Sequence, residues 1–311
     1  MGLPMQERSC SLCGSSGHLT QSTGDSGSDA CTVATSPFTK RPSMRSPFTN
    51  TTRSSPNHLS VVKAGRLFLT VASLGVLSSC LTACRIRPPS SGSPSVLLFE
   101  GSGTSPNDVA AIETLLDENH IRYATANSAR LNGMSPSQLR TYRLLIVPGG
   151  NFEQIGNGLT SGTTANVRNA VGGGLNYLGI CAGAFFAGAS PYNGLNLTSG
   201  VGFSFYAIEA QGIHKAAVDI AVAGSPALAH YWEDGPQLTG WGAVVAKYPD
   251  GTPAIVEGSF GDGWVILSGI HPEAPESWRR GMNFTTPASV ATVYAGTVIR
   301  AALNRTRLEH Y

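Results

Sequence analysis

Gly179-Ile180-Cys181-Ala182-Gly183 is the stretch that decides the fold and directs attention to one side chain. It follows the apolar run at residues 175–180 and precedes a run of small residues, 182–189, that favours a helix. Glycine two residues before and after a cysteine is typical of a sharp strand-to-helix turn, because the flanking positions crowd each other while the central side chain stands clear of the sheet. A helix that begins directly behind Cys181 favours the reactive thiolate. The motif therefore predicts a nucleophile.

A histidine and a carboxylate follow a second strand-like run. Gly269-Ile270-His271-Pro272-Glu273 comes directly after the largely apolar residues 264–268. A thiol nucleophile needs a base to take its proton and a third group to fix the tautomer of that base. His271 fits the first role, and Glu273, two residues further along an extended segment, fits the second. Cys181, His271 and Glu273 are therefore the predicted catalytic triad.

The same chemistry requires backbone N–H groups that stabilise an oxyanion. The amide of Ala182 is one natural donor. Gly150 is the second, because Pro148-Gly149-Gly150 closes another apolar run, and glycines let a backbone approach a substrate closely. Gly149 and Asn151, on either side of Gly150, are predicted to contact the substrate. No HExxH, Walker or dinucleotide-binding pattern is present, so we expect neither a metal nor a cofactor.

Strand-like and helical patterns alternate up to about residue 200. Helix signals include Asn107 or Asp108 as a cap for a helix to about residue 120, and Ser135 at the start of a short helix. This order predicts an α/β fold with a flavodoxin-like, doubly wound, mostly parallel sheet and a nucleophile elbow at Cys181. The predicted strands are residues 95–100, 122–125, 143–147 and 175–180, and a further helix is predicted at 163–171.

Beyond residue 200 the pattern changes to β-hairpins with Asp-Gly turns. A final helix is predicted at residues 287–304, and one domain at 95–308 accounts for all these elements. The strands expected in the hairpin region are 216–222, 242–248, 254–260 and 264–268. The residues of the final helix expected in the core are Val290, Val293, Val298, Ile299 and Leu303.

The first part of the chain has a different composition. Residues 1–60 are rich in Ser, Thr and Pro without apolar periodicity, and we expect a disordered extension that is dispensable or not translated. Residues 62–84 combine two basic residues, an apolar run and the ending Leu81-Thr82-Ala83-Cys84, which together predict a secretory signal peptide. Its ending resembles a bacterial lipobox, in which Cys84 is lipidated. Cys80 is a poorer alternative, and residues 85–94 are the expected tether.

Alternatives for this leader remain open. An uncleaved membrane anchor is one, although residues 67–83 are slightly short of the roughly 20 residues that a span needs. An organellar transit peptide is another. Signals normally lie at the N-terminus, so we expect translation to start near Met44 or Val62. The expected location is the cell envelope, with the protein anchored in the membrane on the periplasmic or extracellular face.

Charge and cysteine usage separate the leader from the body. The formal net charge is +2, but residues 1–83 contain 7 Lys or Arg and 3 Asp or Glu, against 14 and 16 in the remainder. The body is thus slightly acidic, and we expect no nucleic-acid partner. Cys181 is the only cysteine inside the body, which excludes a disulfide framework there. Cys10-x-x-Cys13 resembles part of a zinc knuckle, but its surroundings favour coincidence.

The site motifs together resemble the class I glutamine amidotransferase-like superfamily, and more narrowly the N-terminal domain family of biotin–protein ligases. That resemblance implies a flavodoxin-like fold with Cys181, His271 and Glu273 in the triad positions. It does not imply ligase activity, because no second ligase half or ATP/biotin loop is present. Ala184-Phe185 also departs from true glutaminases. The segments that carry the resemblance are Pro148-Gly149-Gly150, residues 179–187 (GICAGAFFA), 231–236 (YWEDGP), 253–256 (PAIV) and 267–273 (LSGIHPE).

The sequence therefore predicts an exported cysteine amidohydrolase or amidotransferase-like protein. Cys181 would attack an amide or peptide-like carbonyl of a small molecule or peptide and form a thioester. A ligand-binding or scaffold lipoprotein without catalysis is the alternative, favoured if Phe185, Phe186 or Tyr231 fills the site. Redox sensing is a third possibility, and it requires a second thiol such as Cys84.

Overall fold

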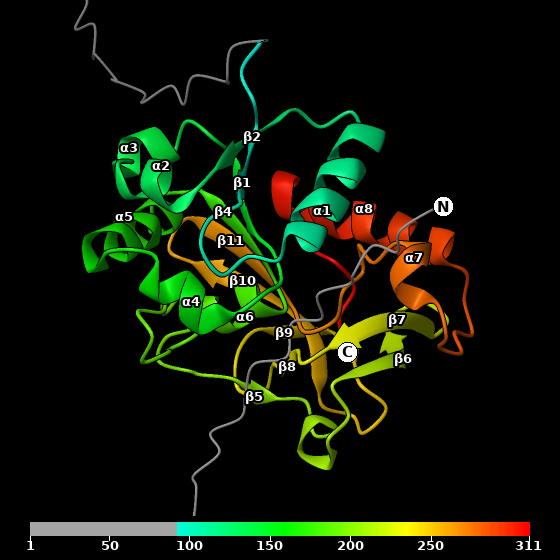
Figure 1. Cartoon of the computed structure of the whole chain (residues 1–311). Helices are drawn as coiled ribbons and strands as arrows, with labels where there is room; N and C mark the ends of the chain where they lie inside the picture. The colour runs from blue at the N-terminus through cyan, green and yellow to red at the C-terminus, as the bar shows by residue number, and fades with distance from the viewer. Residues whose placement is uncertain (1–91) are drawn as a thin grey trace, which may run out of the picture. The chain divides into compact units, whose positions relative to one another are not determined.

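The computed structural model describes residues 92–311 (Figure 1). The predicted extension at 1–60, the signal peptide at 62–84 with Cys80 and Cys84, and most of the tether lie outside the described residues. Within residues 92–311, none of the helices has both the length and the apolar character that crossing a membrane demands.

A nine-stranded sheet forms the centre of the described part, in the order β2-β1-β3-β4-β11-β10-β9-β6-β7. The pairs from β2 to β11 are parallel, and the pairs from β11 to β7 are antiparallel. The strands are β1 (Val96–Phe99), β2 (Tyr123–Ala126), β3 (Leu144–Val147), β4 (Asn176–Ile180), β6 (Lys215–Val222), β7 (Leu228–Glu233), β9 (Ala243–Lys247), β10 (Pro253–Phe260) and β11 (Gly263–Ser268). A separate pair joins β5 (Ser204–Phe205) to β8 (Pro236–Gln237).

Helices cover both faces of the parallel strands (Figure 1). α1 and α8 lie on one face, and the helices between β2 and β4 lie on the other. The helices are α1 (Pro106–Glu118), α2 (Ser128–Asn132), α3 (Pro136–Leu139), α4 (Phe152–Asn157), α5 (Ser161–Gly172), α6 (Ala182–Ala187), α7 (Glu276–Arg279) and α8 (Ala288–Asn304), with a 3-10 turn at Glu209–Gln211.

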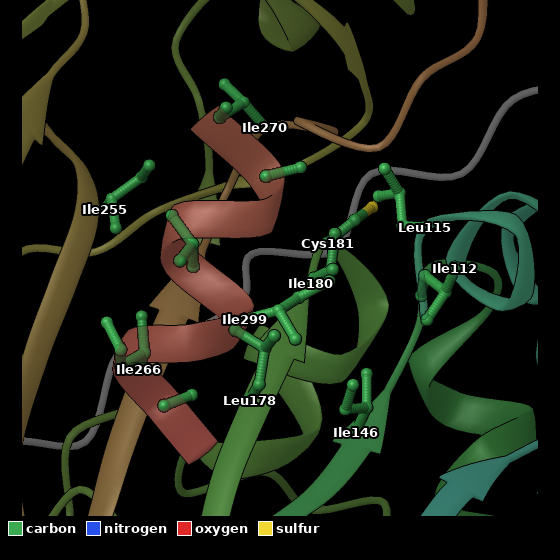
Figure 2. Packing of buried hydrophobic residues seen from close by; sticks show 14 of the residues in the cluster. Ile112, Leu115, Ile146, Leu178, Ile180, Cys181, Ile255, Ile266, Ile270 and Ile299 are labelled. Atoms are coloured by element: carbon green, nitrogen blue, oxygen red, sulfur yellow. The ribbon is translucent and has the colours of Figure 1, made fainter. Parts of the chain in front are cut away.

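The strand side chains explain this layering. Successive residues of a strand point to opposite faces of the sheet. Leu98 and Ile146 accordingly pack in the cluster with α1 and α8, whereas Leu97 and Leu145 pack in the cluster on the other face. Figure 2 shows the first cluster around β4, with Ile299 of α8 close to Leu178. Parallel strands buried on both faces produce the continuous apolar runs of the sequence. The predicted α/β class, doubly wound sheet and hairpin region are confirmed.

Three sequence-based details are wrong. Ser105, not Asn107 or Asp108, caps α1, because its side chain accepts a hydrogen bond from the Asp108 N–H while Pro106 occupies the first turn. Val290 and Val293 are 40% and 71% exposed, because α8 buries alanines such as Ala291 and Ala295 instead. Residues 228–233, which the sequence does not predict as a strand, form β7.

Candidate functional site

Cys181 lies in the sharp turn between β4 and α6. Its backbone has φ 49° and ψ −106°, which is strained for a residue with a side chain. A Cβ atom on Gly179 would lie 2.5 Å from the Gly183 carbonyl oxygen, and one on Gly183 would lie 2.0 Å from the Val147 carbonyl oxygen. Both glycines are therefore required by close backbone packing, as a nucleophile elbow demands.

Strand pairing brings the histidine segment to this turn. β4 and β11 are parallel neighbours in which Ile180 pairs with Ser268, and the Cys181 N–H donates to the Ser268 carbonyl at 2.8 Å. Three residues later, the His271 N–H donates to the Tyr231 carbonyl of β7 at 2.9 Å. The carboxyl ends of the parallel strands, where α/β proteins commonly bind ligands, thus meet the edge strand β7 here.

Two buried carboxylates approach the same nitrogen of His271. Nδ1 forms a hydrogen bond with Oε1 of Glu273 at 2.9 Å, and Oδ1 of Asp108 lies 3.1 Å from Nδ1 without hydrogen-bond geometry. Gly149 provides the room, since a Cβ atom there would lie 2.1 Å from Oδ1 of Asp108 and 2.7 Å from Cε1 of His271. The arrangement fixes the imidazole from one side and leaves Nε2 available.

The charges of this cluster depend on one another. Burial disfavours the imidazolium of His271, but the negative charges that Cys181, Glu273 and Asp108 carry when ionised outweigh burial and raise the pKa of His271 well above the usual value. Burial opposes ionisation of Asp108, yet the charge of His271 holds the pKa of that carboxyl below its usual value. For Glu273 burial wins, and its pKa is raised despite His271. The cluster therefore favours a protonated His271 beside anions.

The sulfur of Cys181 has a hydrogen-bond partner other than His271. Sγ lies 3.4 Å from the backbone carbonyl of Glu233, to which the thiol donates. Nε2 of His271 is buried and has no hydrogen-bond partner among the described residues. Figure 2 shows the side chain of Cys181 at the end of β4, with its sulfur directed towards Leu115 of α1 in that view. The structure thus brings Cys181, His271 and Glu273 together without a thiol–imidazole hydrogen bond.

The predicted oxyanion donors are placed beside the elbow. Gly150, in the loop after β3, forms an isolated antiparallel β-bridge with Thr104. The Ser105 N–H donates to the Gly149 carbonyl, and the Asn151 N–H donates to the Gly103 carbonyl. Neither of these hydrogen bonds uses the N–H of Gly150, which has φ 138°. Ala182 begins α6, and the helix hydrogen bonds there run from Ala184 and Phe185 to the Cys181 carbonyl. The role of both amides as oxyanion donors stays a prediction.

The predicted substrate-contacting residues have structural roles in this loop. The side chain of Asn151 caps α4 by accepting from the Gln154 N–H at 2.9 Å. Gly149 gives space to Asp108 and His271, as described above. Their contact with a substrate stays a prediction.

Aromatic rings enclose the imidazole. Tyr231 lies edge-to-face with His271 at 5.8 Å between ring centroids, and Trp278 does so at 6.0 Å. The Tyr231 hydroxyl donates to Oε2 of Glu233 at 2.5 Å, and burial raises the pKa of Tyr231. Phe185 points to a different cluster, where it stacks on Phe152 at 4.7 Å. The site is therefore walled by Tyr231 and Trp278.

Sequence reasoning missed Asp108, Glu233 and Trp278. The sequence suggests only a helix-capping role for Asp108, and the order of the parallel strands in the folded sheet brings this residue to His271. The available signal was an acidic residue in the first turn of a helix that follows a predicted parallel strand. Glu233 contributes through its backbone carbonyl, for which sequence carries no signal.

Asp108, His271 and Glu273 also have the donor set of a metal site, with ligand atoms within 4.8 Å of one another. Nδ1 is the histidine atom that faces both carboxylates, and it can bind a metal only without its proton. The raised pKa of His271 favours the proton at that position.

Residues 94–192 match the family described as biotin-protein ligase, N terminal. The matched segment contains Asp108, Gly149, Gly150 and Cys181 and ends before His271. The predicted resemblance is confirmed over these residues. No curated protein matches the chain significantly.

Several solved structures are similar to part of this chain. One titled glutamine amidotransferase is 23% identical, with a TM-score of 0.46, and the match covers 58% of this chain and 90% of that one. PurLQS from Thermotoga maritima is 16% identical, with a TM-score of 0.47 and coverage of 67% and 98%. A putative GMP synthase component from Thermoplasma acidophilum is 12% identical, with a TM-score of 0.45 and coverage of 68% and 96%.

Proposed function

We propose that this protein is a cysteine-dependent amidohydrolase or amidotransferase that acts on an amide or peptide-like carbonyl. The observation that carries the proposal is the geometry around His271. Its Nδ1 is fixed by Glu273, its Nε2 is unpaired, and Cys181 stands at a strained turn close enough for its charge to raise the pKa of the imidazole. A nucleophile, a base and an orienting acid in these relations are the components of a catalytic triad.

The reaction follows from these positions. The Cys181 thiolate attacks the carbonyl carbon, and the carbon–nitrogen bond of the resulting tetrahedral intermediate breaks. The leaving amine takes a proton from His271, which gives a thioester at Sγ. Water or a second amine, deprotonated by His271, then attacks the thioester and releases the thiolate. The N–H groups of Gly150 and Ala182 face the oxyanion in both steps, and no redox partner is required.

Alkylation of the full chain tests the proposal directly. Iodoacetamide modification of Cys181 is followed by peptide mass spectrometry between pH 5 and pH 9, with added glutathione and a short cysteine-containing peptide as reference thiols. We expect Cys181 to react faster than those references below pH 8, and His271→Ala to slow it at least tenfold. Equal rates at Cys181 and the references would sink the proposal. Reaction in the presence of EDTA is expected to be unchanged.

The substrate is sought by profiling amide and peptide libraries with the wild type and Cys181→Ala. Release of an amine by the wild type only supports the proposal, and acyl transfer to an added amine distinguishes a transferase from a hydrolase. Binding without release in both proteins favours the alternative, a ligand-binding protein on the same fold. The hydrogen bond from Sγ to the Glu233 carbonyl is the observation that favours this alternative.

We further propose export and lipidation at Cys84, on the basis of the apolar run and the Leu81-Thr82-Ala83-Cys84 ending. The expected result is a lipid-modified Cys84 as the mature N-terminus when the chain is expressed in a bacterial host, and its loss in Cys84→Ser. Cys80→Ser is the control and leaves the modification in place. An intact N-terminus at Met1 contradicts this proposal.

A further inference from the structure

Four aromatic rings cluster on the segments that surround the elbow. Phe185 stacks on Phe152 with 4.7 Å between ring centroids, and Phe205 packs edge-to-face on Phe185 at 4.9 Å. Tyr192 packs edge-to-face on Phe152 at 5.9 Å. These four residues form the aromatic patch. Phe205 and Tyr192 are 39% and 37% exposed, so the patch is accessible, and contiguous exposed apolar surface commonly marks a binding site.

Two of the rings follow the segments that carry the candidate oxyanion donors. Phe152 begins α4 two residues after Gly150, so their Cα atoms are at most about 7 Å apart. Phe185 lies one turn after Cys181 in α6, and its N–H donates to the Cys181 carbonyl at 3.1 Å. A helical side chain points back towards the N-terminus of its helix, so the Phe185 ring extends towards the elbow. An acyl group at Cys181 therefore has the patch within reach of a large side chain.

A third ring is joined to the segment that receives the Cys181 thiol. Phe205 in β5 pairs with Pro236 in β8. Pro236 lies three residues after Glu233, whose backbone carbonyl accepts from Sγ of Cys181. α6 packs against both α4 and β8 (Figure 1). Three separate elements at the candidate site, α4, α6 and β5, thus each contribute a ring to the patch.

The loop that carries Tyr192 is fixed to α4. Asn193 Nδ2 donates to the carbonyls of Gly156 and Leu159 at 3.1 and 3.0 Å. A Cβ atom on Gly156 would lie 1.7 Å from the Tyr192 carbonyl oxygen, so α4 and this loop pack backbone against backbone. A patch that is held in this way requires little ordering when a ligand binds.

We propose that the aromatic patch binds the acyl side chain of the substrate and selects an aromatic one. This inference rests on the proposed function, since it assigns the patch to the substrate of Cys181. Rings prefer edge-to-face and offset-stacked contacts with other rings, and Phe205 and Tyr192 are accessible for such contacts. The four rings carry no charge, so the patch favours an uncharged side chain. The substrate class is therefore an amide of an aromatic acyl group.

Isothermal titration of the full-length Cys181→Ala variant with N-acetyl-phenylalaninamide tests the patch without turnover of the ligand. We expect saturable 1:1 binding, about fivefold tighter than that of N-acetyl-leucinamide and at least about tenfold tighter than that of N-acetyl-alaninamide. Adding Phe205→Leu removes the ring but keeps an apolar side chain, and is expected to abolish the preference for phenylalanine over leucine. Phe205→Tyr should retain the preference. Tyr311→Ala removes an exposed ring outside the patch and should leave all three affinities unchanged.

Absence of saturable binding, equal affinity for the phenylalanine and leucine amides, or an unchanged preference in Phe205→Leu would overturn the inference. Sedimentation velocity tests the other occupant, a second copy of this chain. A dimer that dissociates in Phe205→Leu would assign the patch to self-association and would also overturn it.

Thermal unfolding of each variant establishes that it is folded, and Phe205 is exposed, so its replacement removes little buried surface. The titration measures binding in a variant that lacks the thiol, whereas the proposed catalysis is tested by alkylation of wild-type Cys181. An unreactive Cys181 with a retained preference for the phenylalanine amide contradicts only the catalysis. A reactive Cys181 with equal affinities contradicts only the patch.

Discussion

The parallel and antiparallel halves of the sheet contribute to the site in different ways. The parallel half supplies groups from strand ends, namely Cys181 after β4, Gly150 after β3 and Asp108 in the helix after β1. The antiparallel half supplies backbone and rings from within β7, at Tyr231 and Glu233. β11 belongs to both halves and leads to His271. The ends of the parallel strands thus position the side chains of the candidate site, and the antiparallel edge strand β7 encloses them.

Glycines offer the strongest test of this comparison. Gly183→Ala in the elbow places a Cβ atom 2.0 Å from a backbone oxygen, and we expect the free energy of unfolding to fall by at least about 4 kcal/mol. Gly251→Ala, at φ 85° in a hairpin turn with nothing within 4 Å, is expected to cost only about 1 kcal/mol. Urea unfolding of both variants measures the difference, and equal losses would show that the elbow relaxes.

Helix α8 lies over both halves, and its two faces provide the next test. Ile299→Ala removes a side chain that is 2% exposed and is expected to lower the free energy of unfolding by about 3 kcal/mol. Val293→Ala, at 71% exposure, is expected to change it by less than about 0.5 kcal/mol. A large effect at Val293 would contradict the orientation of this helix.

Two buried histidines are expected to respond to pH in opposite directions. Burial lowers the pKa of His230 in β7 to about 3, so the unfolded chain takes up a proton below pH 6.5 that the folded chain refuses. As the pH falls from 6.5 to 5, the free energy of unfolding should therefore decrease by about 2 kcal/mol because of His230. In His230→Leu this part of the acid sensitivity disappears, as measured by urea unfolding at each pH.

His271 has the opposite sign, because its pKa is raised in the folded protein. Its ion pairs contribute stability that is complete below the unfolded pKa near 6.5 and is lost as the pH rises through the folded pKa. The stability difference between the wild type and His271→Gln is therefore expected to shrink from pH 6.5 towards pH 10. A constant difference would show that His271 is neutral throughout.

The two carboxylates at Nδ1 give the smallest expected effect. Glu273→Gln and Asp108→Asn each remove one anion from His271 and should lower its pKa, which NMR titration of the imidazole measures. We expect about a tenfold slower alkylation of Cys181 at pH 7 in Glu273→Gln, and a smaller loss in Asp108→Asn, whose carboxylate lacks hydrogen-bond geometry. Asp117→Asn on the same helix is the control. If the pKa of His271 falls while the alkylation rate stays the same, the charge of His271 does not control the reactivity of Cys181.

The parallel half could be predicted from sequence because its strands are buried on both faces. Leu144–Val147 is apolar throughout and ends in glycines, so the strand and its loop have a local signature. The elbow is equally local, since Gly179 and Gly183 are needed by atoms within a few residues or in the adjoining strand.

β7 and Asp108 could not be predicted in the same way. β7 (LAHYWE) mixes a charged and two polar-aromatic residues, and His230 is buried there only because α8 covers it with Tyr294. Asp108 has an adequate local explanation in its helix turn. Both acquire their places from partners far away in the chain.

Val290 and Val293 are exposed although the sequence predicts them in the core, because alanines form the buried face of α8.

The bridge between Tyr231 and His271 has a consequence for solubility. β7 is the last strand of the sheet, and an uncovered edge can pair with another molecule and start aggregation. Its outer edge is occupied at Ala229 by the Thr286 hydroxyl and at Tyr231 by the His271 N–H. The segment that carries the proposed catalytic base thus also covers the free edge of β7, which could otherwise pair with another molecule. Shortening this segment to widen the site would expose that strand to neighbouring molecules.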